Sequence, residues 1–385
     1  MNADLMIRKG RILDPAEKID FIGDIAVKSG KIVAIAPEIQ AEGAREILAQ
    51  GCLVTAGLID SHCHIYEGGT WNGMPADLGG IPMGVTAMID AGSTGVSNYQ
   101  NLIRQLRHSK IHGKIMLNIS ACGIIMPTQF NEPVNPELWN LELFDNAFQE
   151  YGNDIVGLKL RANKEVLKGL GLDPVKRTVE LAERYHTKVI VHVTDAPETM
   201  GNVADILRAG DIFCHVYHGT GHTILSENGS IEEKVYTARK RGVIFDAAPG
   251  RGNFSLAVAQ AAMKQGFYPD IISTDVTLQN WHNPIAGNLP LVMSRFLALG
   301  MPVENIISCV TSVPTDAYHL ADGLGTLQVG TAADLSILKL ENTNREFRDR
   351  FGNSIMGSHC FIPKATIIAG KIVYRAADLN IAFEG

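Results

Sequence analysis

The sequence lacks the features of three classes of protein. Its six cysteines include no Cys-x-x-Cys pair, a usage typical of a reducing compartment rather than of a disulfide-stabilised secreted domain. No run approaches the roughly 18 apolar residues of a membrane span, and residues 1–10 contain no apolar signal segment. A net charge of −7 and the lack of Lys/Arg clusters with interleaved aromatics argue against nucleic-acid binding. We therefore expect a cytoplasmic protein that binds a small molecule and neither nucleic acid nor membrane.

Composition and pattern favour a large α/β protein. Hydrophobic residues make up 46% of the chain and charged residues 19%, as in compact globular proteins. In the middle of the chain, short β-rich runs alternate with helical stretches, which is typical of a parallel sheet. Eight such repeats predict a closed (β/α)8 barrel. The candidate strands are Gly57–His64, Val85–Asp90, Lys114–Ser120, Ile155–Arg161, Lys188–Thr194, Asp211–Tyr217, Gly242–Ala247 and Asp270–Asp275.

Both ends of the chain instead carry short apolar runs broken by turn residues, and together they have the size of one small antiparallel domain. We predict a β-sandwich-like domain formed by residues 1–55 plus 322–385, and a metal-binding barrel formed by residues 56–321. Two independent β segments, one at each end, are the alternative. Residues 340–362 mix charge, glycine and asparagine and are interpreted as a long loop. Apolar faces on the outer helices fit either the core or a homo-oligomer interface.

The most informative motif is His62-Cys63-His64, at the end of an apolar run. In a strand, the period of two places Asp60, His62 and His64 on one face and turns Cys63 away. Two imidazoles on adjacent inward positions can hold one metal ion such as zinc, and Asp60 is a candidate to orient one of the rings. The motif alone is weak, because two histidines in a strand more often pack or face solvent.

Other predicted strands end in residues of the same kind. Lys159 lies on the fourth strand, His192 on the fifth and His215 on the sixth, and Asp275 ends the eighth. A barrel presents its catalytic groups at the carboxyl ends of its strands, so these side chains should meet His62 and His64 at one rim. A single strand-end histidine is more often a hydrogen-bonded core residue than a ligand, but six positions that match one pattern favour a metal-dependent hydrolase.

These residues resemble the amidohydrolase superfamily, in its binuclear branch with dihydroorotases, hydantoinases, D-aminoacylases and related deacetylases. Residues 56–64 (AGLIDSHCH) look like the first-strand motif, and residues 325–335 (GTLQVGTAADL) look like the return into the terminal β domain. Residues 85–95 (VTAMIDAGSTG) are similar to deacetylase-like members. The resemblance covers nearly the whole chain.

By this resemblance, Lys159 would be carboxylated on its side-chain nitrogen and would bridge two divalent metal ions, with zinc expected. His62, His64 and Asp275 would complete the site of one ion, and His192 and His215 that of the other. A buried lysine loses its proton readily, and the neutral amine can capture carbon dioxide as an anionic carbamate. Asp275 would take a proton from a metal-activated water and pass it to the leaving group.

Three further residues are candidates for substrate binding. Arg161, two residues beyond Lys159, points to the same face, and Arg251 lies in a Gly-rich segment after the seventh strand. Either guanidinium could bind a substrate carboxylate, with a structural ion pair as the alternative. His218 could compete with His215 as a ligand or contact the substrate. Deacetylase-like relatives often have histidine where this chain has Pro249, which removes one substrate contact but no metal ligand.

The leading hypothesis is a deacetylase-like hydrolase of an amide or ester bond in a small acylated acid. A ring-opening cyclic amidase of the dihydroorotase or hydantoinase type is the near alternative. A mononuclear deaminase would need a glutamate proton shuttle and no bridging lysine, so Lys159 argues against it. A non-catalytic scaffold descended from such enzymes would have lost ligands, whereas all six positions are occupied.

Overall fold

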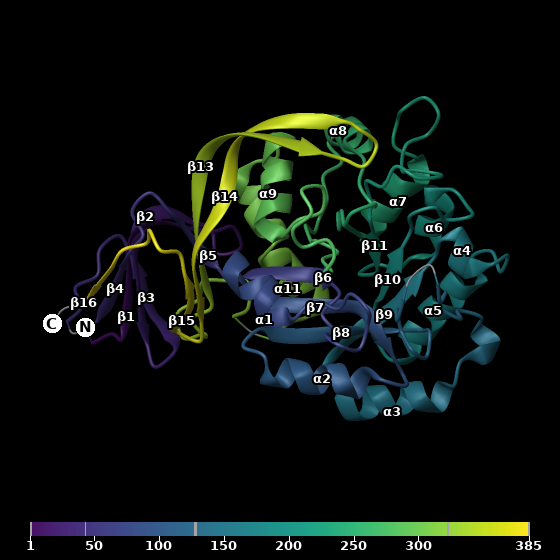
Figure 1. Ribbon diagram of the computed structural model, residues 1–385, viewed down its shortest axis with the longest axis horizontal. Helices are drawn as coiled ribbons and strands as arrows, with labels where there is room; N and C mark the ends of the chain where they lie inside the picture. The colour runs from purple at the N-terminus through teal and green to yellow at the C-terminus, as the bar shows by residue number, and fades with distance from the viewer. Residues whose placement is uncertain (1, 43, 127–128, 322, 384–385) are drawn as a thin grey trace.

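The structure is a computed structural model that describes residues 2–42, 44–126, 129–321 and 323–383. Its central sheet contains seven parallel strands in the spatial order β12-β11-β10-β9-β8-β7-β6 (Figure 1). Neighbours in space are neighbours in sequence, as in a chain of β/α repeats whose crossovers share one hand. The strands are β6 (Leu58–Cys63), β7 (Val85–Gly95), β8 (His112–Asn118), β9 (Ile155–Arg161), β10 (Val189–His192), β11 (Ile212–Cys214) and β12 (Ile244–Asp246).

The two edges of this sheet are joined by the segment that was predicted as the eighth strand. Ile271 forms a parallel bridge to Asp246 of β12, and Val276 forms one to Cys63 of β6. The sheet thereby closes into a TIM-barrel-like α/β fold. Continuous strand pairing is absent from this described segment, so the prediction of a regular eighth strand is wrong. Asp275 has a left-handed φ of +57°, which ends extended pairing beside the bridge.

Helices cover the outside of the barrel because each has one apolar face. In α2, Tyr99, Leu102, Ile103 and Leu106 are buried, at the spacing of one helical stripe. In the described ranges, no helix is both long enough and apolar enough to cross a membrane. The helices are α1 (Ala76–Gly80), α2 (Tyr99–His108), α3 (Leu141–Tyr151), α4 (Lys164–Leu167), α5 (Asp173–Arg184), α6 (Met200–Ile206), α7 (Glu233–Arg241), α8 (Leu256–Lys264), α9 (Leu289–Ala298), α10 (Val303–Cys309) and α11 (Ser312–Tyr318), with 3-10 turns η1 (Ile81–Met83) and η2 (Pro136–Leu138).

A second sheet takes strands from both ends of the chain, as expected. Its path runs β15-β14-β13-β5-β1-β2-β3, with β4 pairing β1 and β16 pairing β4 (Figure 1). The sandwich-like form and the exact domain boundaries stay predictions, and boundary residues 1, 322 and 385 lie outside the described part. The strands are β1 (Leu5–Asp14), β2 (Ile19–Lys28), β3 (Lys31–Ala36), β4 (Arg45–Leu48), β5 (Leu53–Ala56), β13 (Leu335–Arg348), β14 (Ser354–Ile368), β15 (Lys371–Arg375) and β16 (Ile381–Phe383).

The interpretation of residues 340–362 as a loop is wrong. β13 and β14 form one long antiparallel hairpin that stays paired out to Arg348 and Ser354. Two register shifts interrupt the period of two, and most side chains between residues 339 and 348 are not buried, so the strand pattern is weak in the sequence. In Figure 1 the hairpin arches over α9 toward α8. The Phe361 amide donates to Ser294 Oγ of α9 at 2.9 Å, which fixes the hairpin to the barrel.

Candidate metal centre

The ends of three barrel segments bring four predicted ligands to one point. His62 and His64 come from the end of β6, Lys159 from β9, and Asp275 from the segment that closes the barrel. Asp275 Oδ1 lies 3.2 Å from His64 Nε2 and 3.8 Å from His62 Nε2. Lys159 Nζ lies 3.3 Å from His62 Nε2. One ligand atom from each of His62, His64 and Asp275 lies within 4.8 Å of the others, a spacing that one ion can bridge.

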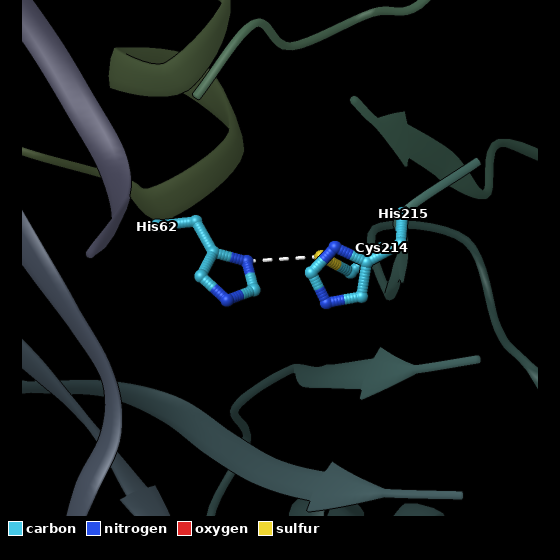
Figure 2. Close-up of side chains that lie close together, drawn as sticks. All are labelled: His62, Cys214 and His215. Carbon is cyan, nitrogen blue, oxygen red and sulfur yellow. Dashed lines mark hydrogen bonds between the residues drawn. The ribbon is translucent and has the colours of Figure 1, made fainter. Parts of the chain in front are cut away.

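The other two predicted ligands, His192 and His215, lie next to each other, and His215 lies beside His62. The ring centroid of His215 is 5.1 Å from that of His62 and 4.4 Å from that of His192. Cys214 Sγ lies 2.9 Å from His62 Nδ1, and Figure 2 shows the thiol and the ring facing each other. Ligand atoms of His62, Cys214 and His215 also lie within 4.8 Å of one another. The structure thus gathers all six predicted ligands around His62.

Hydrogen bonds fix the orientation of two of the rings. His215 Nδ1 lies 2.7 Å from the carbonyl oxygen of Ala248, and because a carbonyl only accepts, this nitrogen carries the proton. The Nε2 atom of His215 therefore keeps a free lone pair. His64 Nδ1 lies 3.0 Å from Ser93 Oγ, and the backbone amide of Ser93 donates to Asp90 at 2.7 Å. Such outer partners are the usual means of aiming a metal-binding imidazole.

Burial sets the charge of the cluster. Desolvation lowers the pKa values of His62 and His192 well below the ordinary value and that of His215 to about 3, so these rings are neutral donors near neutral pH. Burial also lowers the pKa of Lys159, which favours the reactive free amine. Burial by itself would raise the pKa of Asp275, but the hydrogen bond from His64 keeps that pKa below its ordinary value.

Two glycines allow backbone to approach the site closely. At Gly92, with a φ of +86°, an added Cβ would lie 2.5 Å from Lys159 Cγ. At Gly250, with a φ of +46°, it would lie 2.3 Å from Asp275 Oδ2. His215 is itself left-handed, with a φ of +66°, and so is Asp275. Strained backbone of this kind concentrates at functional sites.

The residues present fit a divalent metal site. Neutral imidazole nitrogens and a carboxylate oxygen are donors that zinc accepts. In the described ranges, no carboxylate oxygen lies within 4.0 Å of Lys159 Nζ, although the side chain is only 1% exposed. A buried ammonium without a counter-ion is costly, so this lysine is suited to the neutral or the carboxylated form.

A cavity of about 890 Å³ opens onto the cluster. His64, His192 and Asp275 line it, and so do the predicted substrate contacts Arg161 and Arg251. The cavity therefore gives a small molecule access to the candidate ligands and to two cationic side chains.

The remaining predicted contact, His218, does not line this cavity. Its buried ring contacts Met200, with Nε2 3.2 Å from the Met200 sulfur. A residue that sequence reasoning missed does line the cavity: Arg350, from the tip of the β13–β14 hairpin. No local motif marks Arg350, because only the pairing of the hairpin carries it to the barrel.

Two buried carboxylates, those of Asp60 and Asp246, lie beside the candidate ligands, and the sequence did not predict how either is placed. Asp60 accepts hydrogen bonds from the amide and hydroxyl of Thr274 at 3.0 and 2.6 Å, rather than orienting an imidazole as predicted. Asp246, at the end of β12, lies 3.4 Å from His62 Nδ1, but the hydrogen-bond partner of that nitrogen is the Cys214 thiol at 2.9 Å, which also contacts Asp246 Oδ2 at 3.6 Å. The rule that strand ends carry function could have identified Asp246, since it follows the same pattern as His192.

Comparisons with known proteins agree with this geometry. The model of the amidohydrolase family matches residues 53–373. The chain belongs to the amidohydrolase family. A deacetylase of Enterococcus faecalis is 29% identical over 378 residues, covering 97% of this chain and 99% of its own. A solved structure of an adenine deaminase superposes with a TM-score of 0.88 at 28% identity, covering 97% of this chain and 100% of that one. A solved structure of a dihydroorotase superposes with a TM-score of 0.86 at 26% identity, covering 97% of this chain and 98% of that one.

This amidohydrolase is accordingly a metal-dependent hydrolase that acts on carbon–nitrogen bonds other than peptide bonds. The superfamily resemblance of the sequence is confirmed. All six predicted ligands fall inside the matched span, between residues 53 and 373.

Proposed function

We propose that this amidohydrolase holds two divalent metal ions, zinc in the first instance, bridged by a Lys159 carboxylated on its side-chain nitrogen. The buried position of Lys159 beside His62 is the observation that carries the proposal. Lys159 is buried, its pKa is lowered, and its amine lies 3.3 Å from His62 Nε2. The ligands of one ion would be His62, His64 and Asp275, and those of the other His192 and His215.

We infer that the reaction is hydrolysis of an amide or ester bond in a small acylated substrate that bears a carboxylate. When bound, the metals supply Lewis acidity, which lowers the pKa of water and polarises a carbonyl. Asp275 lines the cavity and has a lowered pKa, so it is ionised and can accept a proton from the attacking water. It would then deliver this proton to the leaving nitrogen or oxygen. Arg251 would bind the carboxylate, whereas Arg161, 3.4 Å from the Glu132 carboxylate, is the weaker of the two predicted contacts.

The proteins similar to this chain support three candidate reactions to different degrees. The deacetylase of E. faecalis supports removal of an acetyl group. The dihydroorotase structure supports a second candidate, ring opening of a cyclic amide. Deamination is suggested by the adenine deaminase structure, but the described residues that line the cavity include no glutamate to shuttle a proton. An acylated acid is therefore the first choice.

Activity measurements with purified, metal-loaded protein test this function. Sets of N-acetyl amino acids and O-acetyl hydroxy acids are offered beside dihydroorotate, hydantoins and adenine. We expect turnover of an acetylated acid, and a loss of about 10²- to 10⁴-fold in kcat for Asp275→Asn, because the proton acceptor is removed. Metal content measured on the same samples separates loss of the acceptor from loss of the ions. Turnover of only the cyclic amides or only adenine would contradict the proposed reaction.

A further inference from the structure

The tip of the β13–β14 hairpin forms part of the cavity wall. Arg350 lies in the turn that joins β13 to β14, and it is the hairpin residue that lines the cavity. The hairpin belongs to the sheet built from the chain ends (Figure 1), whereas the other residues that line the cavity lie between residues 64 and 285, in the barrel. The second sheet therefore contributes a cation to a site whose candidate ligands all come from the barrel.

Hydrogen bonds to Asp349 hold this tip in place. Its carboxylate accepts from the backbone amide of Leu256, at the start of α8, at 2.8 Å. It also accepts from the amides of Phe351 and Asn353, at 2.8 and 2.9 Å, and from Asn353 Nδ2 at 2.9 Å. Asp349 is 4% exposed, so these charge-assisted bonds are sheltered from water. The residue next to it, Arg350, is thus presented from a fixed backbone.

The tip also contacts the rims that follow two barrel strands. A Cβ added to Gly219, after β11, would lie 2.8 Å from the ring of Phe351. A Cβ added to Gly252, after β12, would lie 3.0 Å from Arg350 Nη1. The Arg350 guanidinium therefore lies against the residue that follows Arg251, and both arginines line the same cavity.

Among the described residues, Arg251 and Arg350 lack a carboxylate partner, in contrast to two other arginines of the barrel rim and the hairpin. Arg161 Nη1 lies 3.4 Å from the buried Glu132 carboxylate, and Arg348 Nη2 lies 2.6 Å from Glu346. In the part of the chain that the structure describes, neither Arg251 nor Arg350 has a carboxylate within 4.0 Å. Two guanidiniums that line the same cavity without a carboxylate partner are suited to an anion from the substrate.

We propose that Arg251 and Arg350 form an anion subsite that binds a carboxylate on the leaving part of the substrate, away from the scissile bond. This inference rests on the proposed function and narrows it. Acylated acids whose carboxylate reaches the cavity mouth become preferred substrates, and neutral acylated alcohols and amines become poor ones. Arg350 acts as a specificity-determining residue supplied by the hairpin.

Matched aryl esters and their products test the subsite. Hydrolysis of 4-acetoxybenzoate is compared with that of phenyl acetate, which lacks only the carboxylate. Binding of 4-hydroxybenzoate and of phenol is measured by calorimetry on the same metal-loaded protein. Variants Arg350→Ala, Arg350→Lys and Arg251→Ala are compared with Arg348→Ala, which removes an exposed, ion-paired arginine two residues away that does not line the cavity.

We expect Arg350→Ala and Arg251→Ala to weaken 4-hydroxybenzoate binding by about tenfold and to reduce the preference for 4-acetoxybenzoate over phenyl acetate by a similar factor through KM. Arg350→Lys should restore part of the loss and Arg348→Ala should match wild type, with all differences shrinking at high salt. Equal binding of 4-hydroxybenzoate by wild type and Arg350→Ala would overturn the subsite. Carboxylate-dependent binding, with hydrolysis of neither the esters nor any N-acetyl amino acid, would support the subsite and contradict the proposed reaction instead.

Discussion

At the scale of single residues, desolvation decides which groups in the site carry charge. Burial lowers the pKa values of His62, His192, His215 and Lys159 and raises those of Asp60 and Asp246 to about 7, because desolvation favours the neutral form of each group. Asp275 departs from this pattern because His64 donates a hydrogen bond to it. The result is a set of neutral donors around one ionised carboxylate, which is the arrangement that a cation requires.

Burial of His218 makes the stability of the metal-free protein depend on pH. Desolvation lowers its pKa from 6.5 to about 4. At pH 5 the unfolded chain binds a proton that the folded chain excludes, so stability present above pH 6.5 is lost as the pH falls toward 4. Between pH 7 and pH 5 this residue should remove about 2 kcal/mol of the free energy of unfolding.

Urea unfolding of the metal-free protein at pH 7 and pH 5 checks this expectation. The variant His218→Gln should lose less stability between the two pH values than wild type does. His108→Gln, at an exposed position on α2, serves as the control and should show the wild-type pH dependence. A pH dependence of His218→Gln identical to that of wild type would contradict the account.

At the scale of elements, the sequence predicts the barrel better than the hairpin. Seven strands pair as expected, since parallel strands buried on both faces leave continuous apolar runs in the sequence. The segment at 271–276 keeps only two bridges, because left-handed Asp275 interrupts it. The β13–β14 hairpin was missed because its outer residues are polar and its register shifts twice.

In the candidate site, too, the residues on the barrel could be predicted from the sequence and the residue on the hairpin could not. That the six candidate ligands lie close together could be predicted, because each lies in or directly after a segment of the barrel wall, and topology brings these segments to one rim. Arg350 could not be predicted, because its place depends on the pairing of β13 with β14 and on the docking of the tip by Asp349. Asp246 follows the strand-end rule and was recognisable in principle.

Loss of the Asp349 carboxylate should release the hairpin tip. In Asp349→Ala, the amide of Leu256 and those of the turn lose their acceptor in a buried place. We expect a loss of about 2–3 kcal/mol in the free energy of unfolding and a raised KM for 4-acetoxybenzoate. Glu346→Ala, on the exposed side of the same hairpin, should change neither by much. Urea unfolding and steady-state kinetics measure both quantities; a raised KM in Glu346→Ala alone would contradict the assigned role of Asp349.

At the scale of the whole molecule, the sheet formed by the chain ends is connected to the cavity at the candidate metal centre. The β13–β14 hairpin extends from that sheet, is hydrogen-bonded to α9 from Phe361 to Ser294, and reaches the cavity at its tip, where Arg350 lies. The ligand cluster at the barrel rim would supply the hydrolytic chemistry that the amidohydrolase family shares. The hairpin would supply selection among substrates, so the two parts of the fold would divide these tasks.

The most direct test of the central claim is the metal content of the purified protein, grown with zinc and bicarbonate, beside Lys159→Ala. Lys188→Ala is the control, because it removes another lysine with a burial-lowered pKa from the opposite end of the barrel. Circular dichroism confirms that each variant is folded. We predict about two metal ions per chain in wild type and in Lys188→Ala, and a sharp fall in Lys159→Ala. One ion per chain in all three proteins would contradict a lysine-bridged pair.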